Sequence, residues 1–163
     1  MKYAVLYTSE TGNTKTLAEE IFITLPEGEK TIIDIGKTTD IPPADMYFIG
    51  FGVRNQTYPL KIFDVLEKIE NAEIVVFATC GLPPTEKYKE EIKKGLLAWI
   101  NESCEFSELF VCQGKTSYQQ QLKFRMSYPE RSEELDKIFE EGENHPDDND
   151  LEALGNFIEK IIL

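Results

Sequence analysis

The chain has 163 residues and a formal net charge of −13, and 41% of its residues are hydrophobic and 29% are charged. This composition is typical of a folded globular domain and excludes disordered, collagen-like and coiled-coil proteins. The acidic excess repels phosphate backbones and anionic lipid headgroups, so we expect neither nucleic acid nor a membrane as a partner.

Short apolar runs alternate along the chain with longer segments of helical period, which predicts an α/β protein. The expected β-strands lie at residues 3–7, 31–34, 46–50, 74–79 and 109–112. Their nearly continuous apolar character is typical of parallel strands that helices cover on both faces. Apolar residues at helical spacing predict helices near residues 17–25, 62–69, 92–100 and 151–161. The predicted order is βαββαβαβα.

These elements predict a three-layer α/β/α sandwich with a five-stranded, parallel, doubly wound sheet. The connection at residues 36–45 is too short and too rich in proline for a regular helix. The first strand then lies inside the sheet, where the winding reverses and ligands bind. We expect residues 1–163 to form a single domain, and we interpret the less regular segment 113–144 as an insertion before the last helix.

A polar turn, Thr8-Ser9-Glu10-Thr11-Gly12-Asn13-Thr14, joins the first predicted strand to the first predicted helix. A phosphate is best held where free backbone N–H groups meet at a helix N-terminus, hydroxyls donate, and a glycine lets the backbone approach closely. The turn contains no lysine, which suits a phosphate monoester held by neutral donors better than a transferred nucleotide phosphate. Alternatively, the turn only caps the helix, for which Asn13 alone would suffice.

The spacing Val5-Leu6-Tyr7-x-Ser9-x-x-Gly12-x-Thr14-x-x-x-Ala18-x-x-Ile21, with its T-G-N-T core, resembles the phosphate-loop signature of the flavodoxins. Flavodoxin sheets are a standard example of the doubly wound order 2-1-3-4-5 with FMN at the switch point. The resemblance therefore implies this strand order and FMN as cofactor. It implies that the residues around the phosphate are Ser9, Glu10, Thr11, Gly12, Asn13 and Thr14.

In this family the loops after the third and fourth strands flank the flavin ring, which here are residues 50–58 and 79–83. The resemblance implies further FMN contacts from Phe51, Gly52, Val53, Thr79, Cys80 and Gly81. Phe51, Tyr58 and Tyr88 are candidates for stacking on the ring. The sequence departs from the expected pattern at Gly52, where we expect an aromatic residue, and at Gln56, where we expect glycine. Alternatively, residues 50–55 are an ordinary strand-to-helix turn.

The loop after the fifth strand begins Cys112-Gln113-Gly114-Lys115, and Gln113 and Lys115 are further candidate cofactor contacts. Lys115 could reach a pyrimidine carbonyl of the flavin, or it could be a solvated surface lysine. A G-x-x-x-x-G-K-[ST] nucleotide loop is excluded because Leu109 stands where its first glycine should be. Trp99 lies at helical spacing with Ile92, which predicts a place in the core.

No Ser-His-Asp or metal-ligand cluster is expected around the single histidine, His145, which we interpret as a helix-start residue. Cys80, Cys104 and Cys112 form no C-x-x-C pair, which indicates a reducing compartment and predicts a cytoplasmic protein. We interpret Cys80 and Cys112 as buried thiols and not as a redox pair. The first strand begins too early for a signal peptide, and no apolar run approaches the ~20 residues of a spanning helix.

The leading hypothesis is an FMN-binding, flavodoxin-like electron carrier that shuttles electrons between a reductase and an acceptor enzyme. Residues 77–81, 112–115 and 145–151 resemble a short-chain flavodoxin subfamily that includes accessory proteins associated with bacterial bilirubin reductase. An acidic surface favours redox partners with basic docking surfaces. The alternatives are an FMN-dependent oxidoreductase with its own substrate and a flavodoxin-fold binding module that has lost FMN.

Overall fold

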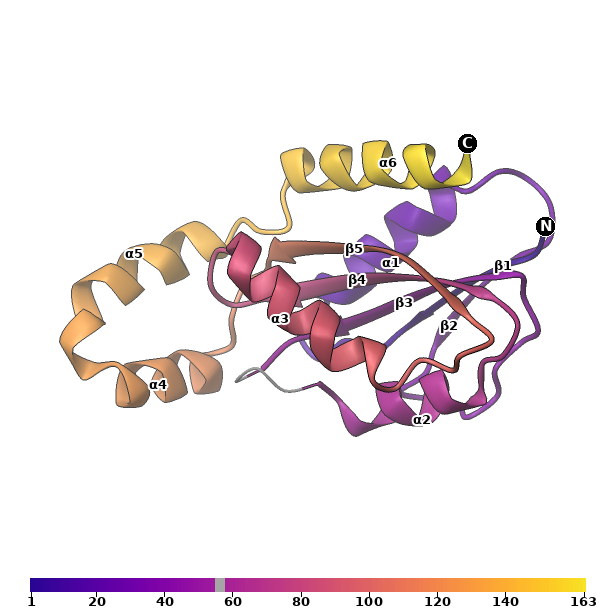
Figure 1. Cartoon of the computed structure of the whole chain (residues 1–163). Helices are drawn as coiled ribbons and strands as arrows, with labels where there is room; N and C mark the ends of the chain where they lie inside the picture. The colour runs from indigo at the N-terminus through magenta and orange to yellow at the C-terminus, as the bar shows by residue number, and fades with distance from the viewer. Residues whose placement is uncertain (55–57) are drawn as a thin grey trace.

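A computed structural model describes residues 1–54 and 58–163, and its centre is a five-stranded parallel sheet (Figure 1). The strands are β1 Tyr3–Tyr7, β2 Lys30–Asp34, β3 Met46–Gly52, β4 Glu73–Cys80 and β5 Glu105–Gln113. They lie in the order β2-β1-β3-β4-β5, and every neighbouring pair is parallel. The predicted sheet, strand number and strand order are confirmed.

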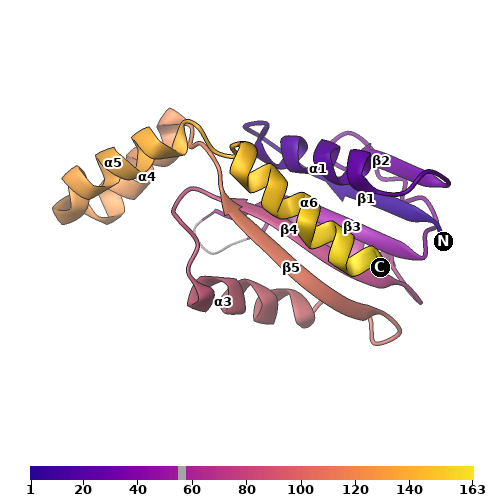
Figure 2. The same cartoon turned by 90° about the horizontal axis from the view of Figure 1, so that it is seen from above.

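Two helices cover each face of the sheet and enclose two hydrophobic cores (Figures 1 and 2). The helices are α1 Asn13–Thr24 and α6 Asp148–Ile162 on one face, and α2 Leu60–Lys68 and α3 Glu86–Leu97 on the other. On the first face, Leu17 and Ile158 pack with Phe48 of β3. On the second face, Ile62 and Leu96 share a core with Ile49 of β3. Burial on both faces explains why β1, β3 and β4 read as continuous apolar runs.

The link between β2 and β3 contains no helix, as its prolines predict. The Tyr47 hydroxyl fixes this link to β3: it donates to the carbonyl oxygen of Pro42 at 2.8 Å and accepts from the backbone N–H of Ala44 at 3.0 Å. This crossover stays short, so β1 lies between β2 and β3 in the interior of the sheet.

The segment 113–144 is helical, which the sequence did not predict. It contains α4 Tyr118–Ser127, a short 3₁₀ helix Pro129–Arg131 and α5 Ser132–Gly142. Figures 1 and 2 show α4 and α5 as a hairpin that projects beyond the carboxyl ends of the strands. Because α4 has no fully buried residue, its sequence lacks the apolar period that reveals the other helices.

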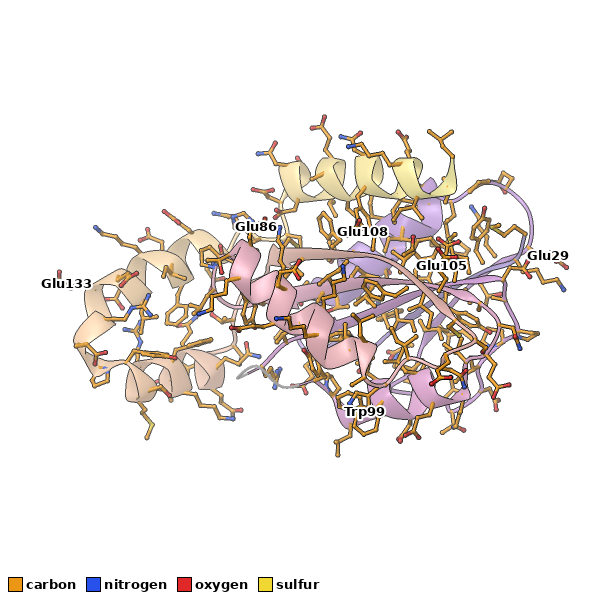
Figure 3. The ribbon with its side chains drawn as sticks, in the orientation of Figure 1. Glu29, Glu86, Trp99, Glu105, Glu108 and Glu133 are labelled. Carbon is orange, nitrogen blue, oxygen red and sulfur yellow. The ribbon has the colours of Figure 1, made fainter. Side chains whose placement is uncertain are left out.

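The prediction that Trp99 lies in the core is wrong. α3 ends at Leu97, so Trp99 follows the helix and keeps 44% of its surface exposed at the edge of the molecule (Figure 3). Its ring packs against Phe63 of α2 with the ring centroids 4.5 Å apart. Within residues 1–54 and 58–163, no helix combines the length and apolar character that crossing a membrane requires.

Candidate functional site

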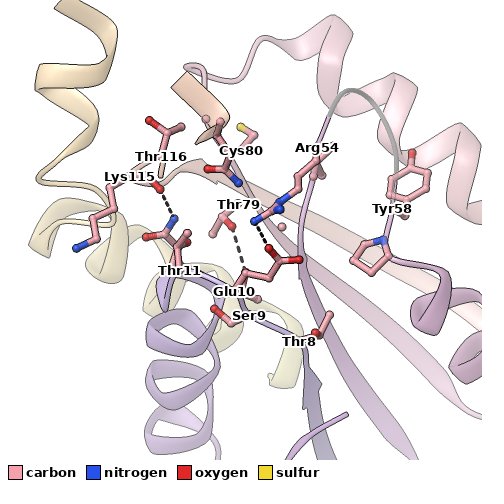
Figure 4. Close-up of a pocket in the computed structure, with 17 residues that line it drawn as sticks. Thr8, Ser9, Glu10, Thr11, Arg54, Tyr58, Thr79, Cys80, Lys115 and Thr116 are labelled. Carbon is pink, nitrogen blue, oxygen red and sulfur yellow. Dashed lines mark hydrogen bonds and ion pairs between the residues drawn. The ribbon is translucent and has the colours of Figure 1, made fainter. Parts of the chain in front are cut away.

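A cavity of about 200 Å³ lies at the carboxyl ends of β1, β3 and β4, where the winding of the sheet reverses (Figure 4). This is the position that a doubly wound sheet offers to a ligand. The predicted site residues that line it are Ser9, Glu10, Thr11, Asn13, Thr14, Gly52, Val53, Thr79, Cys80, Gly81 and Lys115. Sequence reasoning missed Thr8, Arg54, Pro59, Thr116 and Gln120, which also line it. Thr116 and Gln120 were missed because they belong to the segment interpreted as an insertion.

The turn between β1 and α1 presents free backbone N–H groups to this cavity. Gly12 is the N-cap of α1 with φ +88°, a left-handed conformation that favours glycine, and its N–H donates to the Ser9 hydroxyl at 3.1 Å. Within the described part of the chain, no side chain caps α1, and no acidic residue lies in its first turn. The first amides of the helix therefore carry uncompensated positive partial charge, which suits a phosphate.

The alternative in which Asn13 caps α1 is wrong. Asn13 is the first residue inside the helix, and its side-chain amide donates to the carbonyl oxygen of Lys115 at 2.8 Å. This bond spans 102 positions of sequence and fastens the start of α1 to the loop after β5. Asn13 thus shapes the cavity and leaves the helix N-terminus free.

A second internal bond fixes the floor of the cavity. The Thr14 and Thr79 hydroxyls lie 3.1 Å apart, and both side chains are buried. The bond joins the first turn of α1 to the end of β4. It holds these two hydroxyls in place while the more exposed Ser9 and Thr11 remain at the entrance.

Charged groups of both signs lie at the cavity. Arg54 forms an ion pair with Glu10 across it, with the guanidinium nitrogen and the carboxylate oxygen 2.5 Å apart (Figure 4). Lys115 lines the cavity from the loop after β5. Glu10 offsets the charge of Arg54, so Lys115 leaves a small positive excess at the cavity of a chain whose formal charge is −13.

Two predicted stacking residues pack against other aromatic rings, although half-buried Tyr58 also lines the cavity. Phe51 is fully buried and meets the Tyr58 ring edge-on, with centroids 5.4 Å apart, so it does not line the cavity. The Tyr58 hydroxyl donates to the carbonyl oxygen of Ile92 at 3.0 Å, and burial raises the pKa of Tyr58. A Cβ added at Gly52 would meet the Thr79 hydroxyl at an ordinary 3.6 Å. Gln56, where the family pattern has glycine, lies outside the described residues.

Gln113 does not line the cavity and instead connects a loop to a helix. Its amide donates to the carbonyl oxygens of Gly81, at 3.4 Å, and Ile138, at 3.3 Å. It thereby ties the β4–α3 loop to α5. Since the Gln113 side chain is buried, its role here is to position these elements.

Cys80 and Cys112 are buried free thiols, as their sequence context predicts. The Cys80 thiol donates to the carbonyl oxygen of Leu82 at 3.1 Å, and burial raises the pKa of Cys80 to about 12. Burial, together with the nearby Asp150 carboxylate, also raises the pKa of Cys112. Both thiols stay protonated at neutral pH, which disfavours nucleophilic chemistry.

His145 precedes α6, as predicted. Its Nδ1 lies 2.6 Å from a carboxylate oxygen of Asp150, which forms a reciprocal capping box with Asp147. The carbonyl oxygen of His145 also accepts from the N–H of Lys115 at 2.9 Å. The histidine therefore supports the helix start and the loop after β5.

Sequence comparison identifies close relatives over the full chain. The sequence model of the flavodoxin domain matches residues 4–159. A flavodoxin-like domain-containing protein BilS from Clostridioides difficile is 30% identical over 173 residues, which cover 100% of this chain and 97% of that relative. A protein of the same name from Clostridium symbiosum is 28% identical over 179 residues, which cover 97% of this chain and 94% of the relative.

Solved structures confirm the flavodoxin-like fold. A flavodoxin from Streptococcus pneumonia TIGR4 has a TM-score of 0.58 at 14% identity and covers 99% of this chain and 98% of its own. A flavoprotein from Lactobacillus acidophilus NCFM, crystallised in complex with FMN, has a TM-score of 0.51 at 18% identity. It covers 68% of this chain and 93% of its own. At these identities the two likenesses concern the fold alone.

Proposed function

Because the chain belongs to the flavodoxin family, whose members bind FMN, we propose that it binds FMN and carries electrons between a reductase and an acceptor enzyme. We further propose that residues 1–163 act as a single domain and that the protein works in the cytoplasm. The three free cysteines suit a reducing compartment. The proposal also retains the accessory role beside bilirubin reductase that the subfamily resemblance implies.

The uncapped N-terminus of α1 is the observation that carries the proposal. Convergent neutral donors hold a phosphate monoester, and the start of α1 offers free amides together with the Ser9 and Thr11 hydroxyls. A capping side chain begins α3, α4 and α6, whereas α1, like α2 and α5, has none in the described part of the chain, and of these uncapped helices only α1 places its first residues at the wall of the cavity. The residues present therefore fit the phosphate of FMN.

In this proposal, FMN supplies the electron-transfer chemistry, and the chain supplies binding, orientation and a dry surrounding. Ser9, Thr11 and the first amides of α1 hold the phosphate. Thr79, near the end of β4, and Gly81, just after it, line the part of the cavity beyond the phosphate. Lys115 is placed to interact with a polar edge of the cofactor. No side chain is required as a general acid or base, which favours a carrier over an independent enzyme.

The visible absorption spectrum of the purified protein, followed by titration with FMN, tests the proposal. We expect flavin bands or saturable quenching of FMN fluorescence at micromolar protein. Thr11→Ala should weaken FMN binding by roughly five- to tenfold, since a neutral hydrogen bond contributes about 1 kcal/mol. Thr39→Ala, an exposed threonine away from the cavity, is the matched control and should bind FMN normally.

Failure of the wild-type protein to bind FMN would contradict the proposal and favour a binding module that has lost the cofactor. Oxidation of NAD(P)H by the FMN-loaded protein alone would instead favour an FMN-dependent oxidoreductase with its own substrate. Electron transfer that requires an added acceptor protein supports the carrier.

A further inference from the structure

A second cavity, of about 500 Å³, adjoins the first at the ends of β3 and β4, away from the proposed phosphate turn. The two cavities share Val53, Cys80 and Gly81 as wall residues. The first cavity, at about 200 Å³, is smaller than the ~300 Å³ or more that a whole drug-sized ligand occupies. A phosphate and its attached chain suit the first cavity, and the larger cavity is open to a bulkier group joined to them.

The larger cavity has aromatic walls from two separate elements. Tyr88 comes from α3, and Phe124 and Tyr128 come from the α4 hairpin. Phe124 lies in α4 and Tyr128 directly follows its last residue, and the side chains of both line the cavity. Such walls favour a planar, largely apolar ring.

Among the described residues, the loops after β3 and β4 place no aromatic side chain in the larger cavity, and their one aromatic residue at the first cavity is Tyr58. Phe51 is enclosed in the core, and Tyr58 is held between the Phe51 and Phe63 rings and bonded to α3. Gly52 has no side chain, and the sequence at 55–57 is Asn-Gln-Thr. A ring in the larger cavity therefore meets its aromatic partners on α3 and the α4 hairpin.

Resting on the proposed FMN binding, we propose that the flavin ring lies in the larger cavity and packs against Phe124 and Tyr128. The α4 hairpin thus supplies the aromatic contact that Gly52 does not. Tyr88 forms a further part of the wall.

The α4 aromatic residues are held in place before any ligand binds. Phe124 packs against Phe139 of α5 with centroids 5.8 Å apart, and the Arg131 guanidinium lies 5.4 Å from the centre of the Tyr128 ring. An ion pair between Arg125 and Asp136 also joins α4 to α5. A preorganised wall binds a ring with less loss of side-chain entropy.

Gly81 permits the close approach of this wall to the β4–α3 loop. A Cβ added at Gly81 would lie 2.6 Å from a methyl carbon of Thr116 and 3.2 Å from the Phe124 ring. Only a residue without a side chain allows Phe124 to pack this closely on the loop. The buried amide of Gln113, which bonds to Gly81 and α5, holds the same two parts together.

FMN and riboflavin titrations of wild-type protein and Tyr128→Leu test the inference, with flavin fluorescence and visible circular dichroism as readouts. Tyr128 is 41% exposed, so its substitution should leave the fold intact. Loss of one aromatic contact should weaken FMN and riboflavin binding by a similar factor, about two- to tenfold, and reduce the quenching. Tyr128→Phe should restore both, and Tyr118→Leu on the exposed part of α4 should behave as wild type.

Phe124→Leu gives an independent measurement at the second ring and should act in the same direction. Thr11→Ala should instead weaken FMN alone, because riboflavin has no phosphate. If the wild-type protein binds no FMN, the proposed function fails, and this inference fails with it. If the wild-type protein binds FMN but Tyr128→Leu and Phe124→Leu match Tyr118→Leu in affinity, quenching and circular dichroism, only the ring placement is overturned.

Discussion

At the scale of single residues, the site is built from side chains that fasten strand ends to one another. The Thr14–Thr79 hydroxyl pair, the Asn13–Lys115 bond and the Gln113 amide each join segments distant in sequence. Their bonds leave the first backbone amides of α1 free for a ligand. Rigid surroundings of this kind keep donors in position at little entropic cost when a ligand binds.

Cys80 gives a pH prediction at the same scale. Burial raises the pKa of its thiol from 9.0 to about 12, so the folded state retains a proton that the unfolded state loses. The stability from the protonated thiol is fully present below the unfolded pKa and is lost as the pH rises toward 12. At about pH 10 this single group should lower the free energy of unfolding by about 1.4 kcal/mol relative to neutral pH.

Urea unfolding of wild-type protein and Cys80→Ala at a series of pH values checks this prediction. The difference in unfolding free energy between the two proteins should shrink above about pH 9, because only the wild type carries the titrating thiol. Cys104→Ala, at a half-buried cysteine, controls for the loss of a sulfur atom. A difference that stays constant up to pH 10 would show that Cys80 does not titrate in this way.

At the scale of elements, α4 differs from the helices that cover the sheet. It buries none of its residues fully and depends on its N-terminal capping box, in which Ser117 and Gln120 satisfy each other's backbone N–H groups. Ser117→Ala should therefore cost about 1 kcal/mol of local stability. Because few core contacts join α4 to the sheet, we expect local opening of this hairpin and not global unfolding.

Hydrogen exchange followed by mass spectrometry measures this effect. Amides of α4 should exchange about five times faster in Ser117→Ala, whereas β3 and β4 keep wild-type protection. Thr85→Ala removes the corresponding cap of α3 and provides the comparison, since α3 also packs through Ile92 and Leu96. Equal loss of protection throughout the chain would contradict a locally independent hairpin.

The same contrast explains what the sequence could predict about the elements. Apolar residues at helical spacing predict helices such as α6, and unbroken apolar runs predict strands such as β4. The apolar residues of α4 line the larger cavity, pack on α5 or face solvent, so they follow no core period. The turn after β1 was predictable because its function needs particular residue types in a short local stretch. Thr116, Gln120, Phe124 and Tyr128 approach the site only through the hairpin's tertiary placement.

At the scale of the whole molecule, the formal charge of −13 contrasts with the site, where, among the described residues, Arg54 and Lys115 lie with a single carboxylate, that of Glu10. Figure 3 shows Glu133 near the end of the α4–α5 hairpin and Glu86 at the start of α3, two elements that border the larger cavity. Both cations, Arg54 and Lys115, line the smaller cavity. The arrangement favours an anionic cofactor phosphate at the centre and a basic protein at the rim.

This charge distribution predicts how partner encounter depends on salt. With FMN bound and reduced, electron transfer to a basic acceptor protein should slow by about tenfold or more as ionic strength rises from about 10 mM to about 500 mM, because the Debye length falls well below the protein's dimensions. Stopped-flow absorbance measures the rate constant. A small neutral acceptor should show little change under the same conditions. If partners approach past the hairpin, Glu133→Gln combined with Glu134→Gln on α5 should lower both the electron-transfer rate at low salt and its salt dependence. A wild-type rate that does not change with salt would contradict electrostatic steering.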